Sequence, residues 1–323
     1  SNNSQFTLNF HALPLVKSTL QGEGTAANPY QITSAEDFMQ IDDHPNAHYL
    51  ITNDIDFGGA AFTGLQKPFA GHLDGSNMQL TNLFLNGSGL FHEVVDTAVI
   101  KNIYMVEPVM ALSSHGAYAG LVANTMRGGF ADGVADEGGT LHGLSAILSN
   151  VHVIAPTIVG KDFAGVCGGL IGEASLFVDM DVCSLQGADI EVPNAAELGG
   201  LVGSMLTSSS MNVAAFSGQL HGGASVGGIA AYVDGDCSIH HVHVDADITA
   251  ATIVGGVVGA SDRATIANSY VEGTLSLSVA TEKGGVGGIV GALAADIMGN
   301  ATEAIVHDNI VALQSIAAPA GAK

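Results

Sequence analysis

A short glycine-rich phrase recurs along most of this chain and constrains its fold more than any other feature. The phrase consists of two small residues, two aliphatic residues and a final small residue. Its clearest copies are Gly168–Gly172, Gly199–Gly203, Gly255–Gly259 and Gly287–Gly291, and its weaker copies are Ser88–His92, Ala119–Ala123 and Gly227–Ala231. The residues before the aliphatic pair are Gly89, Gly120, Gly169, Gly200, Gly228, Gly256 and Gly288, at spacings of 31, 49, 31, 28, 28 and 32. Such a period is typical of a protein built from stacked repeats.

The segment that follows each phrase predicts how one repeat folds. The seven aligned segments begin at Ala98, Ala146, Val178, Ser209, Cys237, Ala264 and Ala304. Small or apolar side chains dominate the first and third positions, and again the sixth and eighth. Each pair has the period of a strand with one buried face, and the longer step between the pairs requires a bend. Asn, His or Asp occupies the bend in five segments, whereas Val182 and Val213 predict a changed corner in the other two.

These patterns predict an all-β parallel β-helix, a solenoid in which each repeat forms one turn. Equivalent side chains of successive turns, among them Ile100, Leu148, Ile239 and Ile266, are expected to stack about 4.8 Å apart. A β-propeller is the structural alternative, but its blades carry aromatic residues, which make up only 6% here. Ser34 is expected to cap a short helix that covers the N-terminal end of the solenoid.

The order of several motifs resembles the GLUG-repeat proteins, which are bacterial surface and secreted proteins. These motifs are Gly24-Thr-Ala-Ala-Asn-Pro-Tyr-Gln-Ile32, Asn53-Asp-Ile-Asp56, Phe69-Ala-Gly-His-Leu-Asp-Gly75 and the repeated Gly-Gly-Leu-Val-Gly phrase. The resemblance implies a right-handed parallel β-helix with an N-terminal cap, and it carries no catalytic residues. We expect a lead-in or linker at 1–22, one β-helix domain at 23–313 and a tail at 314–323. Within the domain, 23–60 would be the cap and 61–313 the coils.

Composition narrows the classes of partner. The chain has 31 acidic and 8 basic residues, a net charge of −23, so its surface repels nucleic acid and anionic lipid. A hydrophobic fraction of 47% with only 12% charged residues argues against disorder. No run of apolar residues is long enough to span a membrane, so we expect no membrane insertion. We expect the protein to be secreted or on a bacterial cell surface, its signal segment having been removed.

Several chemistry-bearing residues have structural explanations that we favour over catalysis. Cys167, Cys183 and Cys237 fall in or beside inward columns, with Cys167 aligned to Tyr118, and are expected to be buried thiols. His243 is expected to point outward from its strand. The Asp pairs at 54/56, 179/181, 234/236 and 245/247 are expected on solvated faces or turns, although paired carboxylates can act as acid and base in hydrolases.

The best place for function is the 49-residue spacing, which inserts about 18 residues around 124–141. Its ligand-binding candidates are Arg127, Phe130, Asp132, Asp136 and Glu137. Asp234 and Asp236 are weaker candidates for a calcium site, since calcium requires more oxygen ligands than this turn supplies. We expect no other cofactor and assign no catalytic residue.

The sequence therefore favours a non-catalytic, adhesin-like binding module that recognises an extracellular glycan or a host or partner protein, and not an enzyme. A first alternative is a β-helix enzyme that processes polysaccharides, although the two arginines, Arg127 and Arg263, are poorly placed to stabilise a developing anion. A second alternative is a structural stalk that spaces another domain from the cell. The sequence determines neither the ligand nor the oligomeric state.

Overall fold

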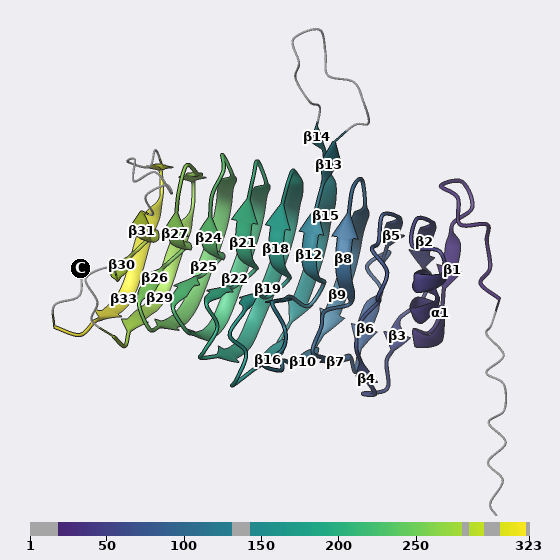
Figure 1. Ribbon diagram of the computed structural model, residues 1–323, viewed down its shortest axis with the longest axis horizontal. Helices are drawn as coiled ribbons and strands as arrows, with labels where there is room; N and C mark the ends of the chain where they lie inside the picture. Colours follow the sequence, from purple (N-terminus) through teal and green to yellow (C-terminus); the bar gives the residue numbers. More distant parts are fainter. Residues whose placement is uncertain (1–18, 131–142, 280–283, 294–303, 321–323) are drawn as a thin grey trace, which may run out of the picture.

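The computed structural model describes residues 19–130, 143–279, 284–293 and 304–320. The protein is nearly all β, with long parallel sheets compatible with a β-helix, and helix α1 (Ala35–Met39) and the 3₁₀ helix η1 (Gln40–Asp43) lie at one end (Figure 1). We call the strands contributed by one repeat a rung. No helix within the described ranges is long and apolar enough to span a membrane.

Three parallel sheets run along the stack of rungs. The six-stranded sheet contains β11 (Tyr118–Ala119), β17 (Val166–Gly168), β20 (Glu197–Gly199), β23 (Ser225–Gly227), β26 (Ile253–Gly255) and β30 (Gly285–Gly287). The seven-stranded sheet contains β8 (Phe91–Val95), β12 (Ala123–Arg127), β18 (Ile171–Ser175), β21 (Val202–Leu206), β24 (Ala230–Val233), β27 (Val258–Ser261) and β31 (Val290–Leu293).

The 18-stranded sheet holds the segments after the glycine phrases. It contains β1 (Tyr30–Ile32), β2 (His48–Ile51), β3 (Ile55–Asp56), β4 (Ala61–Phe62), β5 (His72–Asp74), β6 (Gln79–Thr81), β7 (Phe84–Asn86), β9 (Val99–Val106), β10 (Val109–Ala111), β15 (Ala146–Ile154), β16 (Thr157–Val159), β19 (Val178–Val192), β22 (Ser210–Gly222), β25 (Ser238–Ala250), β28 (Thr265–Ala267), β29 (Tyr270–Leu277), β32 (Ile305–His307) and β33 (Ile310–Ala317). An antiparallel pair, β13 (Gly129–Phe130) and β14 (Gly143–Leu144), projects from the stack (Figure 1).

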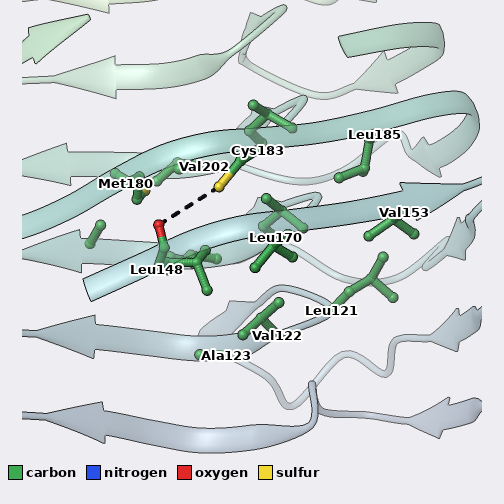
Figure 2. Close-up of a cluster of buried hydrophobic side chains, with 14 of the residues drawn as sticks. Leu121, Val122, Ala123, Leu148, Val153, Leu170, Met180, Cys183, Leu185 and Val202 are labelled. Atoms are coloured by element: carbon green, nitrogen blue, oxygen red, sulfur yellow. Dashed lines mark hydrogen bonds between the residues drawn. The ribbon is translucent and has the colours of Figure 1, made fainter. Parts of the chain in front are cut away.

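The predicted columns are confirmed by the strand registers. Leu148 pairs with Ile100, and Ile239 pairs with Ile266, in neighbouring rungs. The residues at the eighth position of the segments pair from rung to rung in unbroken register. They are Met105, Val153, Leu185, Phe216, Val244, Val271 and Val311. Figure 2 shows part of this core, where the Cys183 thiol donates to the Leu148 carbonyl oxygen at 3.8 Å. Stacking of identical positions thus builds the core one rung at a time.

The expectation of changed corners at Val182 and Val213 is wrong. Both residues adopt φ of +53°, within a few degrees of Asn150 at +52° and Asn268 at +55°. Hydrogen bonding and packing of the neighbouring rungs hold the bend, so the β-branched residues accept the left-handed conformation at a cost of about 1–2 kcal/mol each. Tertiary structure has overridden local preference at these two positions.

The phrase copy at Ala119–Ala123 pairs with the next rung one residue out of the register that alignment on the glycines predicts. Ala119 pairs with Cys167, whereas Tyr118 pairs with Val166, so the expected alignment of Tyr118 with Cys167 is wrong. In this rung Asn124 takes the place of the final glycine, and its side chain bonds the Gly89 amide (2.9 Å) and the Ser88 hydroxyl (2.9 Å). These bonds replace the close backbone contact that the other copies make.

The glycine phrase recurs from repeat to repeat because neighbouring rungs approach each other too closely at these positions to admit a side chain. A Cβ at Gly200 would lie 2.0 Å from the Gly228 carbonyl oxygen, and one at Gly203 would lie 2.5 Å from the Gly172 carbonyl oxygen. Both distances are far below van der Waals contact. The phrase therefore marks where backbone packs on backbone.

The N-terminal end is closed as expected. The Ser34 hydroxyl accepts a hydrogen bond from the Asp37 amide (3.1 Å), which caps α1. Phe38 on this helix is fully buried and packs against Phe57, Phe62 and Phe91, with ring centroids 5.6, 6.4 and 6.3 Å away. The helix thus covers the first rungs with an aromatic cluster.

Candidate functional site

Two glutamates form an acidic seam where the six-stranded and seven-stranded sheets meet. We define this seam by Tyr118, Glu173, Glu197, Ser204 and Tyr232, all partly or fully buried. Glu197 begins β20, directly before the buried Leu198, and Glu173 lies in β18 directly before the buried Ala174. Because side chains alternate across a strand, both carboxylates point away from the core on the outer side of the junction.

The strand registers bring the two carboxylates together. Ser204 pairs with Glu173 in the neighbouring rung and with Tyr232 on its other side. The Ser204 hydroxyl also donates a hydrogen bond to the Glu197 carboxylate. Glu197 and Glu173 therefore lie in neighbouring rungs, which are about 4.8 Å apart along the stack, and the charge of Glu173 reaches Glu197.

This environment makes Glu197 hold its proton more strongly than an ordinary glutamate. Burial raises its pKa, and the negative charge of Glu173 raises it further, while the Ser204 hydrogen bond acts in the opposite direction. The pKa values of the two tyrosines are also raised. The charge of Glu173 is the largest cause for Tyr118, and burial is the largest cause that raises the pKa of Tyr232 to about 12. A carboxyl whose pKa is raised beside a second carboxyl is an arrangement found in acid–base hydrolysis.

The final glycine of the phrase lets the seam close. A Cβ at Gly203 would meet the Val166 side chain at 2.5 Å, and one at Gly172 would meet the Tyr118 side chain at 3.0 Å. With glycine at both positions, the outer faces of the two sheets approach each other. The repeat phrase thus creates the half-buried environment around Glu197.

The sequence analysis missed both glutamates. Their signal was their position, since Glu173 directly follows one copy of the phrase and Glu197 stands two residues before the next. Sequence motifs reveal pairs that lie close together along the chain, whereas the structure pairs residues from different rungs.

The candidates from the inserted segment are only partly described. Arg127 ends the regular strand β12 and bonds the Glu93 carboxylate at 3.2 Å, so the insertion begins after it rather than at Asn124. Phe130 lies in the hairpin stem and packs edge-on against Phe177, with centroids 5.6 Å apart. Asp132, Asp136 and Glu137 lie outside the described residues.

The calcium candidates sit in a turn. The Asp234 carboxylate accepts a hydrogen bond from the Arg263 guanidinium at 3.2 Å, and Gly235 and Asp236 have φ of +71° and +62°. Within the described ranges, no group of three or more His, Cys, Asp or Glu is arranged to hold a metal ion. Arg263 therefore supplies the positive charge that faces Asp234.

The remaining chemistry-bearing residues lie mainly in structural positions. All three cysteines are buried, and burial raises the pKa of Cys167 to about 12 and of Cys237 to about 11. His243 points outward, as expected, and bonds the Glu272 carboxylate at 2.9 Å. Most carboxylates of the Asp pairs bond polar groups of the next rung, as Asp179 does with Ser210 at 2.9 Å.

A histidine pair that the sequence did not reveal lies near the N-terminal end. His48 and His72 are partners on adjacent strands, and their ring centroids are 4.2 Å apart. They line a cavity of about 260 Å³ with Asp74 and Lys101, which form an ion pair at 3.4 Å. Burial is the largest cause that lowers the pKa of His72, followed by the charges of His48 and Lys101.

Known proteins share part of this sequence or its fold. No family model matches the chain. It is 32% identical over 130 residues to halomucin of Haloquadratum walsbyi (strain DSM 16790 / HBSQ001), an alignment that covers 33% of this chain and 1% of halomucin. A crystal structure of a candidate immunoglobulin A1 protease from Bacteroides ovatus is similar, with a TM-score of 0.60 and 19% identity over 90% of this chain and 86% of that one.

A second solved structure, named IgA1 protease, has a TM-score of 0.60 and 18% identity over 86% of this chain and 21% of its own. At these identities the likeness shows a shared fold. The names nevertheless go against our expectation of a non-catalytic, adhesin-like module without enzymatic activity, and we correct that expectation. The chain thus has the parallel-sheet fold of proteins that are named as immunoglobulin A1 proteases.

Proposed function

We propose that this chain is the β-helix domain of a secreted or cell-surface hydrolase that acts on a protein substrate of the immunoglobulin A1 type. The observation that carries the proposal is the similarity to two proteins named as such proteases, over 86–90% of this chain. We further propose that the domain is a right-handed solenoid of the GLUG-repeat kind, spanning 23–313. The parallel registers and the period of the glycine phrase support this assignment.

The acidic seam supplies the chemistry for this proposal. Glu197, whose pKa is raised, acts as the general acid and donates its proton to the leaving group. Glu173 acts as the general base and accepts a proton from the attacking water. The water oxygen bonds to the carbonyl carbon, the carbon–nitrogen bond breaks, and the amine leaves with the proton from Glu197. Ser204 holds the Glu197 carboxyl in place.

A polysaccharide is the second candidate substrate. Paired carboxylates also serve as the acid and the nucleophile of retaining glycoside hydrolases, and the two glutamates lie in neighbouring rungs. In that reaction Glu173 would attack the anomeric carbon while Glu197 protonates the glycosidic oxygen, so that the carbon–oxygen bond breaks as a glycosyl ester forms on Glu173. Water that gives a proton to Glu197 then hydrolyses this ester and frees Glu173. The same two residues therefore serve either substrate, and the assay must include both.

The test incubates the full chain with immunoglobulin A1 and, separately, with neutral polysaccharides, and measures peptide fragments by mass spectrometry and released reducing ends. We expect one substrate to be cleaved, and Glu197→Gln to reduce the rate at least 100-fold. Activity should fall as the pH rises through the raised pKa of Glu197. Glu191→Gln is the matched control, because Glu191 is an exposed strand glutamate of β19 outside the seam.

Two results would contradict the proposal. If the wild-type chain cleaves neither immunoglobulin A1 nor the polysaccharides, the proposed hydrolysis is refuted. Cleavage that Glu197→Gln and Glu173→Gln leave unchanged would remove the acidic seam from the reaction while keeping the enzyme assignment.

A further inference from the structure

The outer faces of three neighbouring strands form a cavity near the N-terminal end of the stack. Strands β2, β5 and β9 pair in parallel there, and alternate side chains point away from the core. The cavity measures about 260 Å³, below the roughly 300–1,000 Å³ that sites for larger organic ligands occupy, so it suits a small molecule. The outward side chains form two rows across the strands, His48, His72 and Val99 in one row and Leu50, Asp74 and Lys101 in the other.

The segment before β1 forms the remaining wall of the cavity. Ala26 and Pro29 line this side. The Gly24 carbonyl oxygen accepts a hydrogen bond from the His48 amide at 2.9 Å, and β1, which follows Pro29 directly, pairs with β2. The wall is therefore tied to the stack on both sides, and the cavity needs no rearrangement to form.

Three basic side chains meet in this cavity although the chain as a whole is strongly acidic. The chain has 8 lysines and arginines against 31 acidic residues, and Lys101 lies here beside His48 and His72. The two imidazole rings have centroids 4.2 Å apart. Within the described residues, no protein group forms a hydrogen bond with the ring nitrogens of either histidine. Those nitrogens are therefore available to a ligand.

Asp74 lines the same cavity, but other donors already occupy its carboxylate. It accepts hydrogen bonds from the Ser76 amide and the Asn102 side chain, both at 2.9 Å, and forms an ion pair with Lys101 at 3.4 Å. Burial raises the pKa of Asp74, but these bonds and the charge of Lys101 outweigh it and lower the pKa overall. An ammonium group has three N–H donors, so Lys101 keeps donors for a second partner.

The groups around His72 make the cavity favourable for an anion. Burial is the largest cause that lowers the pKa of His72, and the positive charges of His48 and Lys101 lower it further. The wall segment 26–29 carries no charged side chain. A bound negative charge would oppose these effects and favour the protonated rings, so anion binding and proton uptake should be coupled.

We infer that this cavity binds a small monocarboxylic acid in its ionised form. Lys101 and the two imidazoles donate hydrogen bonds to the carboxylate, and the half-buried Leu50 and Val99 contact the apolar body of the acid. The affinity rises as the pH falls, because the imidazoles gain their charge near pH 6.5. This site is separate from the acidic seam and adds a second ligand to the proposed function.

The test is isothermal titration calorimetry of the full chain with butyrate as the probe, at about pH 5.5 and about pH 7.5. We expect the affinity to be at least about fivefold higher at the lower pH. Acetate should bind at least about fivefold more weakly than butyrate, since butyrate removes two further CH₂ groups from water. Near pH 6.5 the heat of binding should vary with the ionisation enthalpy of the buffer, because binding takes up a proton. Calorimetry needs no turnover, so its result is independent of hydrolysis.

Variants of the lining residues test the assignment. Lys101→Gln should weaken butyrate binding at least about tenfold at both pH values, and the double variant His48→Gln/His72→Gln should abolish proton uptake. His221→Gln is the matched control, because His221 is an exposed histidine of β22 outside the cavity, and it should change neither property. All of these residues lie on outer faces, so each variant should keep the far-ultraviolet circular dichroism spectrum of the wild type.

Four results would overturn the inference. They are a wild-type chain that binds no butyrate, butyrate binding that does not depend on pH, inorganic phosphate that binds as tightly as butyrate, and binding that Lys101→Gln and the double variant leave unchanged.

Discussion

Replacing Gly200 by alanine tests whether backbone contact between rungs explains the glycine phrase. The new Cβ would lie 2.0 Å from the Gly228 carbonyl oxygen and 2.8 Å from ring carbons of Phe216. The ring is 1% exposed and the oxygen belongs to the backbone, so neither has free space to enter. Overpacking of this kind costs about 1–3 kcal/mol, and moving the rungs apart weakens neighbouring bonds such as Leu201 N–H to Ile229 O at 3.0 Å.

We therefore expect Gly200→Ala to lower the free energy of unfolding by about 3–4 kcal/mol. The assay is urea unfolding followed by far-ultraviolet circular dichroism, because the chain has no tryptophan to report by fluorescence. Gly187→Ala is the control: Gly187 has φ of +64° but nothing within 4 Å of its Cβ position. It should cost only the left-handed conformation, about 1–2 kcal/mol. Equal losses in the two variants would refute the packing argument.

Three further predictions test other parts of the structure. Val213→Asn should raise the free energy of unfolding by up to about 1 kcal/mol, because asparagine accepts the φ of +53° more readily; a lower unfolding midpoint would contradict this. Cys167 should react with a thiol reagent only after unfolding, because it is fully buried and its pKa is raised to about 12; rapid labelling of the native protein would contradict its burial. In the folded chain the pKa of His72 lies below its ordinary value of 6.5, so the unfolded chain binds this proton more readily. The folded state should therefore lose stability as the pH falls below 6.5 toward the lowered pKa. His72→Gln should reduce that loss in thermal unfolding measured across pH, and an unchanged pH dependence would exclude His72 as its source.

Much of the architecture could be predicted because the repeat is encoded locally. The inward columns and the bend follow from the spacing of apolar residues within one repeat, and the registers confirm them for pairs such as Leu148 with Ile100. The cap at Ser34 is likewise a local signal. The alignment at Tyr118 went wrong because Asn124 replaces a glycine there, and only hydrogen bonds to the neighbouring rung show the shift.

The acidic seam could not be predicted in the same way. Glu173 and Glu197 belong to different rungs, and nothing in either segment alone says that Ser204 links them. The raised pKa of Glu197 also depends on how closely the two sheets approach, which the glycines at the junction permit.

The sequence by itself determined the repeat, the buried columns and the positions where a side chain would not fit, because these depend on contacts that recur at a fixed period. Only the tertiary structure decided which polar residues meet and which corners tolerate valine. The physical reason is that these outcomes depend on the spacing and register between rungs. Parallel stacking brings residues together by their place in the rung, whatever their separation along the chain.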